Sequence, residues 1–179
     1  MDFRTEIERL VGQLGGAPVV MVSGVSGSGK TTLATALEPF GYVRLSIDVL
    51  MWERHGMAGH DYPEEKYPEY LAEAESELLR RLDEIISSGG KAVLDFAFCK
   101  RAVRDAYRAF ARSHGAGVYL IYCDTPLSVI KERLRRRNLT PGPDAAIVTD
   151  EMAERFFAGF QRPDTDEECI VFGGNDENN

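Results

Sequence analysis

The strongest constraint on the fold is a glycine-rich segment that directly follows a short apolar run. Residues 18–24 read PVVMVSG, a nearly continuous apolar stretch that is typical of a strand buried on both faces of a parallel sheet. Residues 24–31 read GVSGSGKT, and a helix is expected to begin at Lys30 and continue through TTLATALEPF. The sequence therefore predicts a strand, a tight glycine turn and a helix in immediate succession.

The same segment has the residues that a phosphate-binding loop needs. Gly24, Gly29, Lys30 and Thr31 match the pattern G-x-x-x-x-G-K-[ST] between an expected strand and an expected helix. Glycines allow backbone N–H groups to turn toward phosphate oxygens, and the helix start directs its positive dipole end at the same anion. The alternative is a glycine-rich turn that binds nothing.

Each residue of this segment has an expected role. Lys30 is expected to reach the terminal phosphates of a nucleotide, and the Thr31 hydroxyl is expected to ligate Mg²⁺. The expected nucleotide contacts are Gly24, Val25, Ser26, Gly27, Ser28, Gly29, Lys30, Thr31 and Thr32.

Short apolar runs alternate along the chain with segments of helical period. Strands alternating with helices imply one α/β domain over residues 1–179, with a parallel sheet and right-handed crossovers. The expected strands are residues 18–24, 42–48, 91–98, 117–124 and 168–172. The expected helices are residues 1–16, 30–40, 71–86, a segment ending near Ser113, 125–138 (Thr125 as N-cap, Pro126 first) and 150–160.

Residues 51–70 interrupt this alternation. The segment carries one tryptophan, two histidines and three tyrosines among glycine, proline and acidic residues, so it is expected to be an irregular insertion. Its aromatic side chains could form a substrate pocket, with Trp52 as a candidate contact. Local packing of a long loop is the alternative.

Aspartates follow several of the expected strands. Asp48 ends the second strand, where ligands of α/β sheets bind, and could accept a proton from a substrate hydroxyl; otherwise it caps the segment that follows. Asp95 lies in an apolar run, where an unpaired carboxylate is costly, so it is expected at a magnesium ion or substrate, or in an ion pair with Arg101 or Arg104. Asp124 precedes a helix start and is expected to be structural.

Four arginines gather at the end of the helix over residues 125–138. Arg133, Arg135, Arg136 and Arg137 could simply form a solvated face, because cations near a helix C-terminus are mildly stabilising. Phosphoryl transfer, however, needs cations on the transferred group. Arg133 and Arg137 are four residues apart and share one helix face, so at least one of the four is expected to be catalytic.

Composition limits the classes of partner. The chain has 29 acidic and 21 basic side chains and a formal net charge of −8, which argues against DNA or RNA because basic residues supply most of that affinity. Cys99, Cys123 and Cys169 have no zinc spacing and are expected to be reduced thiols. A cytoplasmic location is expected from these reduced thiols. Apolar runs are shorter than a membrane helix needs, and the N-terminus lacks a signal-peptide core.

Taken with their order, these motifs give the chain a family resemblance. Over about residues 17–172 it resembles the small P-loop kinases of the adenylate, gluconate and shikimate kinase type. It looks most similar to the branch that contains chloramphenicol phosphotransferases, zeta toxins and polynucleotide 5′-kinases. The motifs that carry this resemblance are GVSGSGKT, LSID, VLDFAF and IKERLRRRN. It implies a three-layer P-loop NTPase fold with a five-stranded parallel sheet in the order 2-3-1-4-5, and a helical lid at about residues 133–150.

The resemblance also implies roles for single residues, with ATP and Mg²⁺ as nucleotide and metal. Asp48 matches the base that activates a substrate hydroxyl, and Asp95 matches an aspartate near substrate or metal. Arg133 matches an arginine that stacks on adenine, and Arg137 one that contacts phosphate. The expected catalytic residues are Lys30, Asp48, Arg133 and Arg137, the metal ligands Thr31 and Asp95, and the substrate contacts Asp48, Trp52, Asp95 and Arg101.

The expected activity is transfer of the γ-phosphoryl group of ATP to a hydroxyl of a small molecule, such as an antibiotic, nucleoside, sugar or sugar nucleotide. The alternatives are a polynucleotide 5′-hydroxyl kinase and a nucleotide-binding regulator without turnover. Polynucleotide kinases carry an arginine three residues after the base, whereas this chain has Met51 there and its nearest arginine at Arg54. That departure weakens the first alternative.

Overall fold

Five parallel strands form one sheet in the order β2-β3-β1-β4-β5. In the computed structural model the described residues are 2–139 and 147–173. The strands are β1 (Val19–Ser23), β2 (Tyr42–Ser46), β3 (Lys91–Asp95), β4 (Val118–Cys123) and β5 (Cys169–Phe172). The expected fold class and strand order are therefore confirmed.

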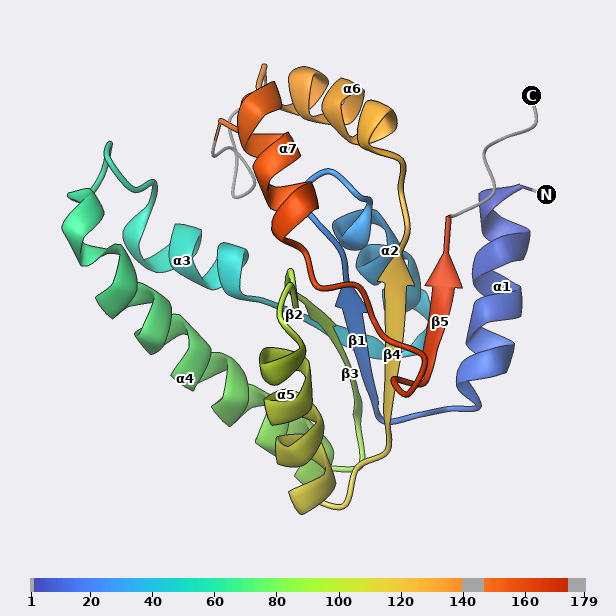
Figure 1. Ribbon diagram of the computed structural model, residues 1–179. Helices are drawn as coiled ribbons and strands as arrows, with labels where there is room; N and C mark the ends of the chain where they lie inside the picture. Colours follow the sequence, from blue (N-terminus) through green and yellow to red (C-terminus); the bar gives the residue numbers. More distant parts are fainter. Residues whose placement is uncertain (1, 140–146, 174–179) are drawn as a thin grey trace.

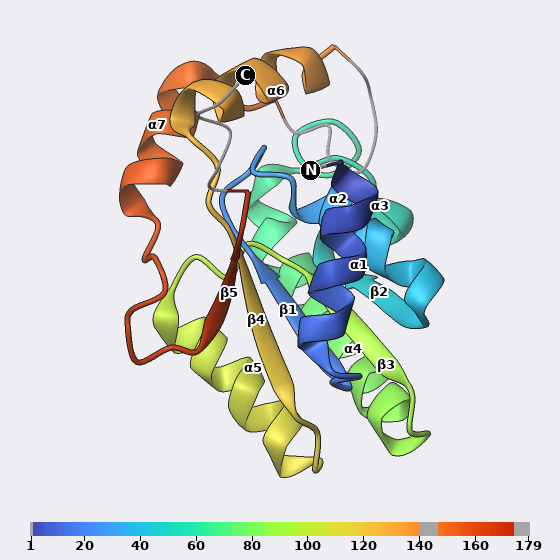
Figure 2. The same cartoon turned by 90° about the vertical axis from the view of Figure 1, so that its right-hand side faces the viewer.

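Helices cover both faces of this sheet and the carboxyl ends of its strands. The α-helices are α1 (Phe3–Leu14), α2 (Lys30–Leu37), α3 (Ile47–His55), α4 (Tyr67–Ser87), α5 (Arg101–Ser113), α6 (Leu127–Arg137) and α7 (Asp150–Gly159). Two 3₁₀ turns, η1 (Glu38–Phe40) and η2 (Glu64–Lys66), lie between them. In Figures 1 and 2, α1 and α2 lie on one face and α4 and α5 on the other, with α6 and α7 beyond the strand ends.

The alternation of side chains along β1 explains the two cores of the molecule. Val20 and Val22 pack with α1 and α2, whereas Val19 and Met21 pack with α3, α4 and α5. Every residue of β1 is buried, as expected for a central strand with both faces covered. A third cluster joins α6 and α7 to Val25 and to the end of β4.

The segment at 51–70 differs from its predicted irregular form. Residues up to His55 belong to α3, and α4 already begins at Tyr67, so the irregular part covers only residues 56–66 and includes η2. Helix α3 forms because Ser46 caps it, accepting a hydrogen bond from the Val49 N–H at 3.4 Å, and because Ile47, Leu50 and Met51 are buried. Asp48 is therefore in the first turn of a helix and does not end a strand.

The start of α6 also differs from the prediction. Pro126 occupies the N-cap position, where no side chain caps the helix. The Thr125 hydroxyl donates instead to the Ser28 carbonyl at 2.8 Å, because Thr125 is buried against the glycine-rich loop.

Of the predicted lid, residues 140–146 lie outside the described residues. Across 2–139 and 147–173, none of the helices has the length and apolar character needed to cross a membrane.

Candidate functional site

The glycine-rich loop turns between β1 and α2 where side chains would not fit. Gly27 has φ 83°, and a Cβ there would lie 2.9 Å from Leu134 Cγ and 3.2 Å from the Ile130 carbonyl oxygen. At Gly24 a Cβ would lie 2.5 Å from Ser28 Oγ. The absence of a Cβ at Gly27 lets the loop backbone pass close to α6, and glycines allow backbone N–H groups to turn toward a ligand.

Neighbouring strand ends hold the loop in place. The Gly24 N–H donates to the Ala97 carbonyl at 3.2 Å, and Ser23 Oγ lies 3.4 Å from the Phe98 carbonyl that accepts its proton. Thr125, after β4, holds the far side of the loop through Ser28. The loop is thus supported from both neighbours of β1, which fits a binding element that must keep its shape.

Polar groups of the loop point to an anionic ligand. Lys30 Nζ donates to the Val25 carbonyl at 3.0 Å, so its ammonium group lies across the loop. Ser28 Oγ is buried and has no hydrogen-bond partner among the described residues. A phosphate oxygen in the loop would accept from both groups, which is the arrangement that a nucleotide phosphate needs.

Two of the four arginines of α6 lie on this loop. Arg133 Nη1 donates to the Ser28 carbonyl at 3.3 Å, and Arg137 Nη1 donates to Ser26 Oγ at 3.0 Å. Arg135 forms an ion pair with Asp150, and Arg136 pairs with Glu132 in the same helix at 2.5 Å. Arg133 and Arg137 are four residues apart, so they share the helix face that contacts the loop. The other two arginines form ion pairs away from the loop.

The pKa of one buried thiol indicates which charged groups lie near the end of β4. Burial raises the pKa of the Cys123 thiol to about 12, Lys30 and Arg133 act to lower that pKa, and Asp95 acts to raise it. The lysine of α2, an arginine of α6 and the aspartate that ends β3 thus all lie close enough to the end of β4 for their charges to act on Cys123. This convergence comes from the parallel sheet, which brings the carboxyl ends of its strands to one edge.

Asp95 has an arginine partner that the sequence did not suggest. Its carboxylate is 4% exposed and accepts from Arg44 Nη2 at 2.7 Å and from Nε at 2.9 Å. Arg44 lies on β2, two residues before Ser46, which is opposite Asp95 in the sheet register. Arg44 and Asp95 therefore project from the same face of the sheet, and the expected alternatives Arg101 and Arg104 do not provide the partner.

Thr31 and Asp95 are the magnesium ligands predicted from the sequence, and their hydroxyl and carboxylate groups are oxygen donors of the kind that Mg²⁺ takes. Thr31 lies in the first turn of α2, directly after Lys30, and is half-buried. The described residues contain no group of three or more His, Cys, Asp or Glu side chains that could hold a metal alone. Mg²⁺ characteristically takes one or two protein ligands and completes its shell with phosphate and water oxygens, so this small donor set suits it.

Asp48 lies close to aromatic side chains of α3 and α4. It is exposed in the first turn of α3, and its spacing places it on one helix face with Trp52, which is half-buried. The phenol of Tyr67, at the start of α4, has a pKa raised by burial and further by the negative charge of Asp48. Asp48 is therefore next to the aromatic side chains that could receive a second substrate.

Arg101 and Arg104 both bind the segment that follows α7. Arg101 holds Asp166 through two hydrogen bonds of 2.7 and 2.6 Å, and also contacts Asp105 at 3.4 Å. Arg104 is fully buried and binds Glu167. These acidic partners, Asp105 apart, are more than 60 residues away along the chain, and the sequence contains no local signal for the pairing.

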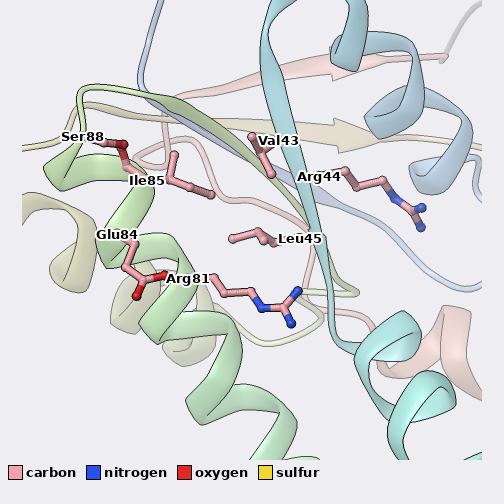
Figure 3. Close-up of a pocket in the computed structure, with 7 residues that line it drawn as sticks. All are labelled: Val43, Arg44, Leu45, Arg81, Glu84, Ile85 and Ser88. Carbon is pink, nitrogen blue, oxygen red and sulfur yellow. The ribbon is translucent and has the colours of Figure 1, made fainter.

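A separate hollow of about 310 Å³ lies between β2 and α4. Figure 3 shows Leu45 and Ile85 facing one another there, with Arg81 beside them and Arg44 directed to the other side of the strand. The hollow lies beside the carboxyl-terminal half of α4, and its lining contains none of the site residues predicted from the sequence.

The fold and the glycine-rich loop define a P-loop NTPase domain. A loop that follows the central strand of a 2-3-1-4-5 parallel sheet and leads into a Lys-Thr helix start is the phosphate-binding element of this class. Residues 19–163 match the AAA domain family, and the chain belongs to it.

Solved structures share this fold at low sequence identity. A gluconokinase from Sinorhizobium meliloti 1021 is similar over 87% of this chain and 81% of its own, at 22% identity and a TM-score of 0.56. A sugar kinase from Janibacter sp. HTCC2649 covers 87% and 84%, at 24% identity and a TM-score of 0.60. The tunicamycin resistance protein of Deinococcus radiodurans covers 80% and 79%, at 19% identity and a TM-score of 0.52. A search of the curated proteins found no match.

Proposed function

We propose that this protein is an ATP-dependent kinase that transfers the γ-phosphoryl group to a hydroxyl of a small molecule, such as an antibiotic, nucleoside, sugar or sugar nucleotide. The observation that carries the proposal is the position of Arg133 and Arg137, whose guanidinium groups contact the same loop as Lys30. Three cations at one phosphate-binding loop suit the transfer of a phosphoryl group better than simple retention of a nucleotide.

In the proposed mechanism, each charged group of the site has its own role. Backbone N–H groups of the loop and Lys30 bind the β- and γ-phosphates, and the two arginines neutralise charge on the transferred group. Asp48 accepts the proton of the acceptor hydroxyl as that oxygen attacks phosphorus. Thr31 and Asp95 would hold Mg²⁺, with Arg44 fixing the orientation of the Asp95 carboxylate. Bound there, the ion would neutralise negative charge on the phosphates of the nucleotide.

Three of the similar structures support a small acceptor. Two of them are named as a gluconokinase and a sugar kinase, and a third as a tunicamycin resistance protein. Sugars and antibiotics are among the acceptor classes proposed for this chain.

A polynucleotide acceptor is less well supported. Met51, at the position where the polynucleotide kinases carry an arginine, is buried in the hydrophobic core that α3, α4 and α5 form on one face of the sheet. Arg54 is held by Glu73 at 2.7 Å and by Glu77 at 3.6 Å. Neither residue offers a cation for the phosphate of a nucleic acid strand.

The test is transfer of ³²P from γ-labelled ATP to a panel of hydroxyl compounds. The panel contains nucleosides, aminoglycosides, phenicols, sugars, sugar nucleotides and a 5′-hydroxyl oligonucleotide. Asp48→Asn is expected to lower kcat by about 100-fold or more, because general-base assistance contributes on that order, while ATP affinity stays unchanged. Undiminished transfer by the Asp48→Asn variant would remove Asp48 from the mechanism, and label on the oligonucleotide alone would establish the polynucleotide activity instead.

A further inference from the structure

The carbonyl group of Ser28 receives hydrogen bonds from two side chains of the segment that follows β4. Thr125 Oγ1 donates to it at 2.8 Å, and Arg133 Nη1 donates to it at 3.3 Å. Ser28 is 4% exposed and Thr125 is 7% exposed, so both residues are largely shielded from water. The orientation of the peptide group between Ser28 and Gly29 therefore depends on these two donors.

The backbone on either side of Ser28 can rotate with little steric resistance. Gly27 has φ 83° and Gly29 has φ 101°, values that a residue with a Cβ rarely adopts. Ser28 is thus joined to the loop through a glycine at each end. A segment with this freedom needs contacts from outside the loop if it is to keep one arrangement before the ligand binds.

The peptide group between Ser28 and Gly29 leads directly into α2. In a trans peptide the N–H points away from the carbonyl, so the Gly29 N–H is directed away from the two donors. Gly29 is the N-cap of α2, and no side chain caps this helix. The first N–H groups of a helix have no carbonyl partner within it, which makes them donors for an anion.

Thr125 is held more firmly than the other donor, Arg133. It comes directly after Asp124, whose N–H donates to the Phe172 carbonyl at 3.0 Å, and directly before Pro126. The proline ring restricts the backbone of the preceding residue, and a β-branched side chain has few χ1 rotamers. Arg133 has a long side chain, a longer hydrogen bond and a proposed role at the transferred group. Thr125 is therefore the donor suited to hold the peptide group throughout binding and transfer.

We propose that Thr125 is a positioning residue for the nucleotide, whose hydroxyl fixes the peptide group between Ser28 and Gly29 so that the Gly29 N–H faces the bound phosphates. This rests on the nucleotide binding that the proposed function requires. Thr125 acts through the Ser28 carbonyl, without contact to the nucleotide. When the hydroxyl is removed, the peptide group takes more orientations in the free chain, and binding is weaker because it must first order that group.

Two matched pairs of chains test the role of the hydroxyl. Threonine and valine have similar shapes and differ in the hydroxyl, as serine and alanine do, so the wild type is compared with Thr125→Val, and Thr125→Ser with Thr125→Ala. Titration calorimetry of the purified full chain with ADP and with a non-hydrolysable ATP analogue gives Kd. In each pair the chain without the hydroxyl is expected to bind both nucleotides about tenfold more weakly, because one buried hydrogen bond contributes on that order.

ADP and the ATP analogue are expected to lose affinity by the same factor. The N–H groups of such a loop contact the α- and β-phosphates, which both nucleotides carry. With the acceptor identified by the panel, Thr125→Val should lower kcat/KM for ATP about tenfold and keep kcat at saturating ATP within about threefold of the wild type. A residue that only positions the nucleotide affects its binding more than the chemical step.

Thermal unfolding of the same chains separates positioning from folding. A lower midpoint for the chains without the hydroxyl, with Kd unchanged in both pairs, would show that Thr125 serves the fold alone and would overturn the proposal. If Thr125→Val does not fold, the comparison of Thr125→Ser with Thr125→Ala decides in the same way. A wild-type chain that binds nucleotide but transfers phosphate to no acceptor would overturn the proposed kinase and leave the role of Thr125 standing. A wild-type chain that binds neither nucleotide would overturn both.

Discussion

At Gly27 the loop passes so close to α6 that the smallest side chain would collide with it. Gly27→Ala adds a Cβ that would lie 2.9 Å from Leu134 Cγ at a residue with φ 83°, so both sterics and backbone strain oppose it. We expect a loss of about 1–3 kcal/mol in the free energy of unfolding and at least about tenfold weaker ATP binding. Thermal unfolding and titration calorimetry with a non-hydrolysable ATP analogue would measure the two effects.

Gly12→Ala is the matched control for this substitution. Gly12 lies inside α1, and a Cβ there would meet nothing within 4 Å. Alanine in a helix interior is expected to stabilise the fold by up to about 1 kcal/mol without changing ATP affinity. Equal behaviour of the two variants would mean that α6 does not constrain the loop.

Single residues also show which parts of the site the sequence could predict. The loop from Gly24 to Thr31 was predictable because its chemistry is local and its pattern is read directly from neighbouring residues. The partner of Asp95 was not, since Arg44 is 51 residues away and reaches it only through the register of β2 with β3. Asp48 was placed at the end of a strand because the Ser46 cap that starts α3 was not recognised.

The arginines of helix α6 fall into two groups: those that contact the glycine-rich loop and those that lie at the solvent-exposed surface. Arg137 donates to Ser26 of the loop, whereas its neighbour Arg136 pairs with Glu132 on the exposed side. Their helical spacing, more than their charge, separates the two sets of contacts. The sequence predicted that Arg133 and Arg137 share one helix face, but their spacing left open which of the four arginines is catalytic.

The two neighbours provide a matched pair of variants. Arg137→Gln is expected to lower kcat by about 10- to 100-fold, because a cation that meets the transferred phosphoryl group contributes mainly in the transition state. Arg136→Gln removes an exposed pair of little energetic value and should leave kcat within about twofold. Steady-state kinetics with the acceptor identified by the panel would measure both, and equal losses would show that the arginines act only through the helix.

At the scale of the whole molecule, a buried charge network joins segments that are distant in sequence. Arg104 of α5 is fully buried, donates to both carboxylate oxygens of Glu167 at 2.8 and 2.5 Å, and also binds the carbonyls of Phe98 and Gln161. Phe98, whose backbone has φ 47°, also accepts a hydrogen bond from Ser23, directly before the glycine-rich loop. The network therefore ties the loop to the segment that connects α7 to β5.

Glu167 gives this network a predictable dependence on pH. The Arg104 guanidinium, helped by Arg108, lowers the pKa of Glu167 from its usual 4.5 to about 2, although burial acts in the opposite direction. Because the folded state has the lower pKa, ionisation of Glu167 stabilises the fold fully above about pH 4.5, and this stability is lost as the pH falls toward 2. The shift corresponds to about 3 kcal/mol at neutral pH.

Glu167→Gln is expected to lower the free energy of unfolding at pH 7 by about 3 kcal/mol, because Arg104 stays buried without its counter-charge. The variant should also lose part of the wild-type decline in stability between about pH 4.5 and 3. Glu168→Gln changes an exposed neighbour and should stay within about 0.5 kcal/mol of the wild type at every pH. Urea unfolding at a series of pH values measures all three chains. A Glu167→Gln chain that kept the wild-type pH dependence would show that Arg104 holds the two segments together through its carbonyl contacts alone, and that the charge on Glu167 adds nothing to the fold.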